Sequence, residues 1–306
     1  MPPSHAVIAG VNKAGTTSLF ASLSTHPAIA PASIKETRYF LPARYGHPLE
    51  PISVYDGYFA DAVPGAVRLE ATPSYFYGGA AVGRAIVELL PDPRVLVVLR
   101  EPVSRAISFF QYQKARLRFP AELTLAEYLA EADELDESDF EDPDNEKFMA
   151  YRGGRYDDFM VPWLEQFGHD RLRFLFFEDL VRDPLPVLRG VASWLDLDPL
   201  GIDAEALSSE NRTTGYRSGA LQRVALSGND RFETFLRRHM GLKRRLRWVY
   251  YRVNGQMPQD SVPDAIRDAL AERYREPNTR LAARLGSLGV GLPDWLAAAP
   301  GGQATA

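Results

Sequence analysis

The sequence contains no cysteine, so disulfide bonds and thiolate metal sites are excluded. This absence is typical of a protein from a reducing compartment. No uninterrupted apolar run reaches the roughly 20 residues that a membrane-spanning helix needs. The first apolar run begins at Ala6, which leaves no room for a signal peptide. We therefore expect a cytoplasmic protein without a membrane span.

Basic residues are not in excess, because 35 Lys and Arg residues stand against 40 Asp and Glu residues. The net charge of −5 argues against a general nucleic-acid binder, which would present a basic surface. Apolar residues form 45% of the chain, which predicts a packed globular core. We see no internal repeat and expect one domain over residues 1–306, with an acidic connector at 133–147 and a flexible tail at 297–306.

The stretch from Val7 to Leu19 begins with an apolar run and continues with glycines, a lysine and hydroxyl residues. It predicts a buried strand, a tight turn and the start of a helix. Backbone N–H groups at such a turn, together with the helix dipole, form an anion site. The candidate contacts are Lys13, Ala14, Gly15, Thr16, Thr17 and Ser18. The alternative is an ordinary turn with helix-capping threonines.

The loop differs from the nucleoside-triphosphate loop G-x-x-x-x-G-K-[ST] at one decisive position. Gly10 and Gly15 have the required separation, but Thr16 stands where that loop has its lysine. The lysine of this chain comes earlier, at Lys13.

Apolar runs alternate with helical patterns along the rest of the chain, which indicates βαβ units. This predicts an α/β fold with a mostly parallel sheet of about five strands and helices on both faces. The clearest strands are expected at 67–71, 95–99 and 172–177, and the helices at 18–26, 81–90, 104–116, 156–167, 184–195 and 265–285. Residues 30–65 are expected to be loop.

Arg100 follows the central strand and Ser108 lies in the next helix, which suggests a second phosphate contact. Ligands of open parallel sheets bind at the carboxyl ends of strands, and Arg matches phosphate geometry. A surface ion pair is the alternative for Arg100. Kinases of this fold carry an acidic metal ligand at this strand end. The sequence Arg100-Glu101-Pro102 is unsuited to that role, so we expect no metal.

These motifs together resemble those of sulfotransferases. Residues 13–19 look like the 5′-phosphosulfate loop of that family, and residues 100–108 look like its 3′-phosphate motif. Further matches are at 36–40, 70–76, 163–164, 182–184, 215–216 and 276–278. The chain is most similar to the heparan sulfate N- and 3-O-sulfotransferase domains and their bacterial relatives. The resemblance implies a P-loop-kinase-like fold, 3′-phosphoadenosine 5′-phosphosulfate (PAPS) as co-substrate and adenosine 3′,5′-bisphosphate (PAP) as product.

The resemblance also implies residue roles. Lys13 would stabilise the leaving group, and the loop that follows it would hold the 5′-phosphate. Arg100 and Ser108 would bind the 3′-phosphate, and Tyr216 would lie near the adenine. Glu36 would be the catalytic base. The alternative for Glu36 is a loop carboxylate paired with a neighbouring Lys35 or Arg38.

The chain departs from the family pattern near the acceptor. Ala71 stands where the heparan enzymes have Lys, and Arg38 stands where the 3-O enzymes have His. We therefore expect a small-molecule, lipid or carbohydrate acceptor with a hydroxyl or amine, rather than heparan sulfate. Its expected contacts are Arg38, Tyr39, Tyr75 and Phe76. A metal-dependent nucleotide kinase and a catalytically silent nucleotide-binding protein are the alternatives, and a homodimer is left open.

Overall fold

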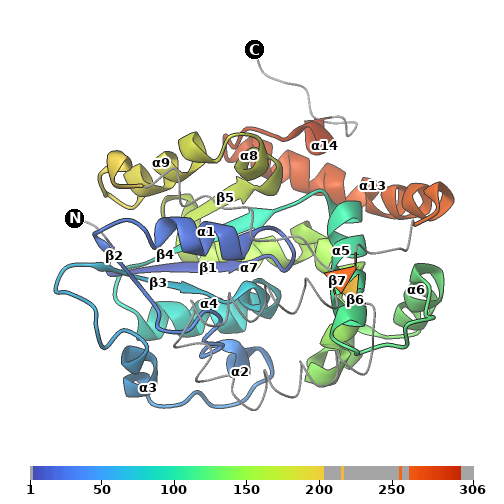
Figure 1. Ribbon diagram of the computed structural model, residues 1–306, viewed down its shortest axis with the longest axis horizontal. Coiled ribbons are helices and arrows are strands. Elements are labelled where there is room, and N and C mark those ends of the chain that lie inside the picture. The colour runs from blue at the N-terminus through green and yellow to red at the C-terminus, as the bar shows by residue number, and fades with distance from the viewer. Residues whose placement is uncertain (1–2, 203–214, 217–254, 257–261, 298–306) are drawn as a thin grey trace.

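The computed structural model describes residues 3–202, 215–216, 255–256 and 262–297. Its centre is a five-stranded sheet in which every pairing is parallel, with the order β2-β3-β1-β4-β5 (Figure 1). The strands are β1 (His5–Gly10), β2 (Ile29–Pro31), β3 (Val67–Ala71), β4 (Pro93–Leu99) and β5 (Leu172–Phe176). A separate antiparallel pair joins β6 (Gly215–Tyr216) to β7 (Gly255–Gln256). The predicted α/β class with a parallel sheet of about five strands is confirmed.

Two of the three inner strands, β1 and β4, form because their residues are mostly apolar on both faces. All six residues of β1 are buried, and so are six of the seven residues of β4. Their register places Val7 opposite Val95, with Glu70 of β3 on the other side of Val7. A parallel sheet covered by helices on both faces requires this kind of continuous apolar strand.

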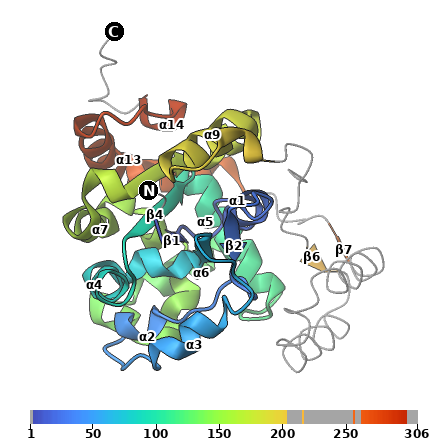
Figure 2. The same cartoon turned by 90° about the vertical axis from the view of Figure 1, so that its left-hand side faces the viewer.

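Helices cover both faces of the sheet. On one side, α1 (Thr16–Leu23) contacts α9 (Pro184–Trp194), and on the other α4 (Gly79–Leu89) contacts α7 (Tyr156–Arg171) (Figure 2). Helix α13 (Asp264–Ser287) packs against α7 and α5 (Pro102–Ala115). The other α-helices of the described residues are α2 (Leu41–Arg44), α3 (Ile52–Gly57), α6 (Leu125–Asp133), α8 (Phe177–Arg182) and α14 (Asp294–Ala297). None of the helices in these residues is long and apolar enough to cross a bilayer.

The strand order places a topological switch point between β1 and β4. The chain leaves β1 towards β2 and β3 on one side, whereas it leaves β4 towards β5 on the other. Ligands of open α/β sheets bind where the connections diverge in this way, beyond the carboxyl ends of the strands. The segments that follow β1 and β4 are therefore the first place to look for a site.

Most expected elements lie within a few residues of their observed bounds, but the first helix and the expected loop at 30–65 differ. The first helix ends at Leu23 rather than His26. Residues 30–65 contain β2, α2 and α3. Strand β2 is three residues long and includes Pro31, which an edge strand tolerates, so the local pattern does not reveal it.

The acidic segment 133–147 is folded onto the body of the protein. It forms two 3₁₀ helices, η2 (Glu137–Glu141) and η3 (Pro143–Phe148). Glu137 is paired with Arg152, and Asp133 lies 2.6 Å from Arg273. Arginines distant in the sequence thus bind the carboxylates that composition alone suggests are solvated. Of the flexible tail expected at 297–306, Ala297 is the last residue of α14, and residues 298–306 lie outside the described residues.

Candidate functional site

The loop after β1 has the backbone of an anion site. Lys13 and Gly15 have φ of 71° and 79°, so the chain turns sharply before α1. Gly15 is the N-cap residue of α1, and no side chain among the described residues caps this helix. By contrast, the Glu101 carboxylate accepts from Val103 N at 2.8 Å and Ser104 N at 2.7 Å at the start of α5. The start of α1 is therefore the kind of helix N-terminus that binds an external anion.

Close packing explains both glycines of this loop. A Cβ on Gly10 would lie 2.7 Å from the Cβ of Phe76. A Cβ on Gly15 would lie 2.9 Å from the ring of Phe177, at a positive φ as well. The spacing of the two glycines thus reflects contacts with η1 (Pro73–Gly78) and α8.

Arg100 joins the end of β4 to the loop after β1. Its Nη1 donates to the carbonyl of Lys13 at 2.9 Å, and its guanidinium lies 4.5 Å from the centre of the Phe177 ring. Tyr156 donates to the Arg100 carbonyl at 2.7 Å. Burial lowers the pKa of Arg100, opposed by Tyr156 and the carboxylates of Glu178 and Glu101. An arginine in a protein nevertheless stays charged. Lys13 and Arg100 therefore share one edge of the sheet, as the sequence predicts.

Helix α5 carries the other predicted contacts on this side. Ser108 is half-buried on α5, and Tyr112 follows one turn later on the same face. The Lys13 ammonium lies 4.6 Å from the centre of the Tyr112 ring. Strand β6 contacts α5, which brings the backbone of Tyr216 to this helix. The Tyr216 side chain lies outside the described residues.

Of the other predicted phosphate contacts, Ala14 and Thr16 are buried, whereas Thr17 and Ser18 are half-buried on the first turn of α1.

The Glu36 loop is attached to the neighbouring strand β3. Glu36 N donates to the carbonyl of Ala71 at 2.9 Å. The Glu36 carboxylate lies 2.7 Å from Lys35 Nζ, with side-chain exposures of 37% and 14%. Glu36 and Arg38 have φ of 64° and 57°, a conformation that costs a non-glycine residue about 1–2 kcal/mol. The structure contains the ion pair that the alternative interpretation of Glu36 expects, and a paired carboxylate can still take a proton.

Three of the four predicted acceptor contacts lie in the core. Tyr75 and Phe76 are 0% exposed and Tyr39 is 6% exposed, because η1 packs against β1. Tyr39 donates to the carbonyl of Glu50 at 2.5 Å. A direct contact between an acceptor and these rings would require them to become exposed. Arg38, the fourth, is exposed.

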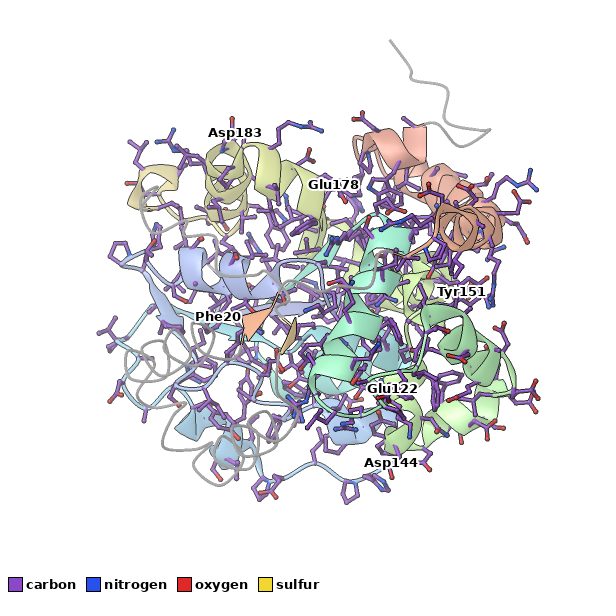
Figure 3. All side chains as sticks on the ribbon, turned by 45° about the vertical axis from the view of Figure 1, so that its right-hand side comes forward. Phe20, Glu122, Asp144, Tyr151, Glu178 and Asp183 are labelled. Carbon is purple, nitrogen blue, oxygen red and sulfur yellow. The ribbon has the colours of Figure 1, made fainter. Side chains whose placement is uncertain are left out.

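Several residues of this site were not predicted from the sequence. Phe177 contacts both Gly15 and Arg100, and Tyr112 lies beside Lys13. Glu178, labelled in Figure 3 on α8, accepts from Glu101 N at 2.9 Å. Two signals could have identified the aromatic residues. Phe177 directly follows a strand end, and Tyr112 lies four residues after Ser108 on one helix face.

The carboxylate beside Arg100 has a structural role. Both oxygens of Glu101 accept backbone hydrogen bonds at the start of α5, so they are engaged where a kinase would hold a metal. Within the described residues, no three His, Asp or Glu side chains lie close enough together to bind a metal ion.

Comparison with known protein families agrees with this geometry. The profile of the family described as "Sulfotransferase domain" matches residues 3–217. Heparan sulfate glucosamine 3-O-sulfotransferase 3B1 of Mus musculus is 30% identical over 217 residues, which cover 69% of this chain and 50% of that protein. Bifunctional heparan sulfate N-deacetylase/N-sulfotransferase 1 of Caenorhabditis elegans is 28% identical over 196 residues, 62% of this chain and 22% of that protein.

The chain thus spans about half the length of the mouse relative and less of the nematode one. Among solved structures, a sulfotransferase from Alicyclobacillus acidocaldarius has a similar fold, with a TM-score of 0.63 and 20% identity. The superposition covers 96% of this chain and 99% of that one. The predicted fold is therefore confirmed.

Proposed function

The chain belongs to the sulfotransferase domain family, and we propose that it transfers the sulfuryl group of PAPS to a hydroxyl or amine of an acceptor. One observation carries the proposal. Arg100 is hydrogen-bonded to the Lys13 carbonyl at the switch point of the sheet, beside the uncapped start of α1. Two anion-binding features therefore lie together.

The residues present fit a nucleotide with two separate phosphate groups. The first-turn amides of α1, with the Thr17 and Ser18 hydroxyls, suit a 5′-phosphate. Arg100 uses one of its five N–H donors on Lys13, and Ser108 lies on the helix that follows. These two residues suit a 3′-phosphate. The sequence departs at Thr16 from the loop that binds nucleoside triphosphates.

PAPS, when bound, supplies the sulfuryl group and the leaving phosphate. In the proposed reaction Glu36 accepts the proton of the acceptor hydroxyl or amine as general base. The new bond forms between the acceptor atom and sulfur, while the bond from sulfur to the phosphate oxygen breaks. Lys13 neutralises the negative charge that develops on that oxygen.

For the acceptor, we propose a chemical class rather than one compound. A small-molecule, lipid or carbohydrate hydroxyl or amine fits a chain that has Ala71 and the exposed Arg38 beside Glu36. The cytoplasmic location and a homodimer stay predictions. A screen of labelled PAPS against a panel of such acceptors identifies the class. Absence of transfer to every class, with PAP bound tightly, would instead support a catalytically silent binding protein.

The first prediction concerns the 3′-phosphate. We expect PAP to bind far more tightly than AMP without magnesium, and Arg100→Ala to remove most of this preference. A charge-assisted hydrogen bond contributes about 1.5–3 kcal/mol, or roughly ten- to a hundredfold in affinity. Isothermal titration calorimetry measures both nucleotides, with Arg84→Ala on the exposed face of α4 as the control. Equal affinities of the unsubstituted protein for PAP and AMP would contradict the assignment.

The second prediction concerns the base. Glu36→Gln keeps the shape of the side chain but cannot accept the proton, so the rate should fall roughly a hundredfold or more. PAP affinity should stay nearly unchanged, because Glu36 is not assigned to the nucleotide. Glu88→Gln, an exposed position on α4, is the matched control. Near-normal turnover of Glu36→Gln, under conditions in which chemistry limits the rate, would rule out the base role.

A further inference from the structure

Glu70, at the end of β3, is a fully buried acidic residue to which no catalytic role has been assigned above. Its side chain is 0% exposed. Its Oε1 atom accepts three hydroxyl hydrogen bonds, at 2.5 Å from Thr37, 2.8 Å from Thr72 and 2.8 Å from Tyr75. Burial raises the pKa of Glu70, and these three hydrogen bonds and the charge of Lys35 oppose the rise. Such a concentration of donors on one buried oxygen calls for an explanation.

Each of the three hydroxyls also accepts one backbone amide of the loop that carries Glu36. Arg38 N donates to Thr72 Oγ1 at 3.2 Å. Tyr39 N donates to Thr37 Oγ1 at 3.3 Å, and Phe40 N donates to Tyr75 Oη at 3.1 Å. We call these three hydroxyls, of Thr37, Thr72 and Tyr75, the hydroxyl relays. An amide that donates to a hydroxyl leaves the hydroxyl proton for another acceptor, and that acceptor is Glu70 in all three cases.

The loop needs such support because its backbone is strained. Glu36 and Arg38 are non-glycine residues with φ of 64° and 57°. Such conformations persist only where the surrounding structure over-determines them, and they gather at functional sites. Glu36 N donates to the Ala71 carbonyl, and the relays hold the amides of Arg38, Tyr39 and Phe40.

Stability alone does not account for Glu70. Its Oε2 atom is buried and has no hydrogen-bond partner among the described residues. A buried carboxyl group with one unsatisfied oxygen opposes folding, and an apolar residue of similar size would avoid that penalty. A carboxylate at this position is instead suited to fix the direction of several hydroxyl groups at once.

We propose that Glu70 is a positioning residue that acts through the hydroxyl relays on the loop carrying Glu36. It keeps that loop in the one conformation in which the Glu36 carboxylate faces the acceptor. The proposal rests on the base role of Glu36 in the proposed function. Glu70 itself touches neither nucleotide nor acceptor in this assignment, since its side chain is enclosed by the core.

The test removes one relay without changing the shape of the loop. Thr37 is half-buried, and Thr37→Val replaces only its hydroxyl, whereas Thr37→Ser keeps it. We expect Thr37→Val to lower kcat about tenfold or more, with the KM for PAPS and the affinity for PAP within about twofold. Thr37→Ser should return kcat to within about threefold. Glu70→Gln should lower kcat in the same way, and thermal melting verifies that each variant is folded.

Thr279→Val is the matched control for the loss of a hydroxyl. That hydroxyl donates to the Arg275 carbonyl within α13, away from the loop, so kcat should not change. A second measurement distinguishes positioning of Glu36 from a general structural role: the effect of Thr37→Val on kcat in a protein that also carries Glu36→Gln. If the relay acts through Glu36, Thr37→Val should add no further loss of kcat there, because the group being positioned has been removed.

The outcomes separate the two proposals. Near-normal turnover of Glu36→Gln would overturn both the base role and the positioning role. A large loss in Glu36→Gln with normal kcat in Thr37→Val would overturn the positioning role alone. An equal loss from Thr37→Val in both backgrounds would also overturn it, because the hydroxyl would then act independently of Glu36.

Discussion

His5, at the first position of β1, is a buried histidine far along the strand from the proposed site. It is 3% exposed and lies against the rings of Tyr55 and Phe59. Burial, with a smaller contribution from the charge of Arg68, lowers the pKa of His5 from 6.5 to about 4. The imidazole is therefore neutral in the folded protein at pH values where an unfolded chain would already be protonated.

This residue should make stability depend on pH. Between pH 6.5 and about 4 the unfolded state binds the proton and the folded state does not, so stability falls as pH decreases. The full difference corresponds to about 3 kcal/mol. Urea unfolding of the protein and of His5→Asn, at several pH values across this window, measures the contribution. His5→Asn should flatten the dependence by that amount, and an unchanged dependence would contradict the lowered pKa.

At the scale of elements, α1 and α5 begin at the same edge of the sheet but differ at their first turns. The Glu101 carboxylate satisfies the first amides of α5, whereas α1 begins at Gly15 without a side-chain cap. The two helices would therefore make different kinds of contact with a ligand. In the proposed site, helix α1 directs its N-terminus to a phosphate, while α5 contributes Ser108 and Tyr112 from its side.

Gly15→Ala should impair this helix start in two ways. Its positive φ costs an L-residue about 1–2 kcal/mol, and the new Cβ would lie 2.9 Å from Phe177. Gly46→Ala is the matched control, because Gly46 has a φ of 69° with no atom within 4 Å of the added Cβ. Both variants should lose stability in thermal melts, but only Gly15→Ala should also lose PAP affinity. Equal PAP affinity in the two variants would contradict the role of the loop.

At the scale of the whole molecule, hydrogen bonds between segments distant in the sequence support the helices around the proposed site. Arg105 of α5 is fully buried and donates to the carbonyls of Met149, at 2.9 Å, and Ala150. Tyr274 of α13 donates to the Tyr151 carbonyl at 2.8 Å. Arg284 of α13 donates to Asp157 of α7 at 2.7 Å. The helix that carries Ser108 thus packs with α13, which is in turn bonded to α7.

The parts of the site that could be predicted from the sequence are those encoded in one short stretch. The loop from Gly10 to Ser18 and the pair Arg100 and Ser108 are read from adjacent residues and strand ends, and the structure joins Arg100 to Lys13 of the loop. The sequence places Tyr75 and Phe76 in a turn and predicts that they contact the acceptor, but it does not show that this turn is buried. Its burial depends on the packing of η1 against β1, which no local pattern shows.

The sequence by itself determined the α/β class, the strands of the main sheet except β2, and the candidate anion-binding turn. Buried apolar runs, glycine geometry and helix periodicity are properties of neighbouring residues, so they can be read from the order of the chain. Only the tertiary structure decided that Glu70 is joined to Thr37, 33 positions away, and that Phe177 lies against Gly15. These contacts follow from the strand order β2-β3-β1-β4-β5, which brings strand ends together that are separated along the chain.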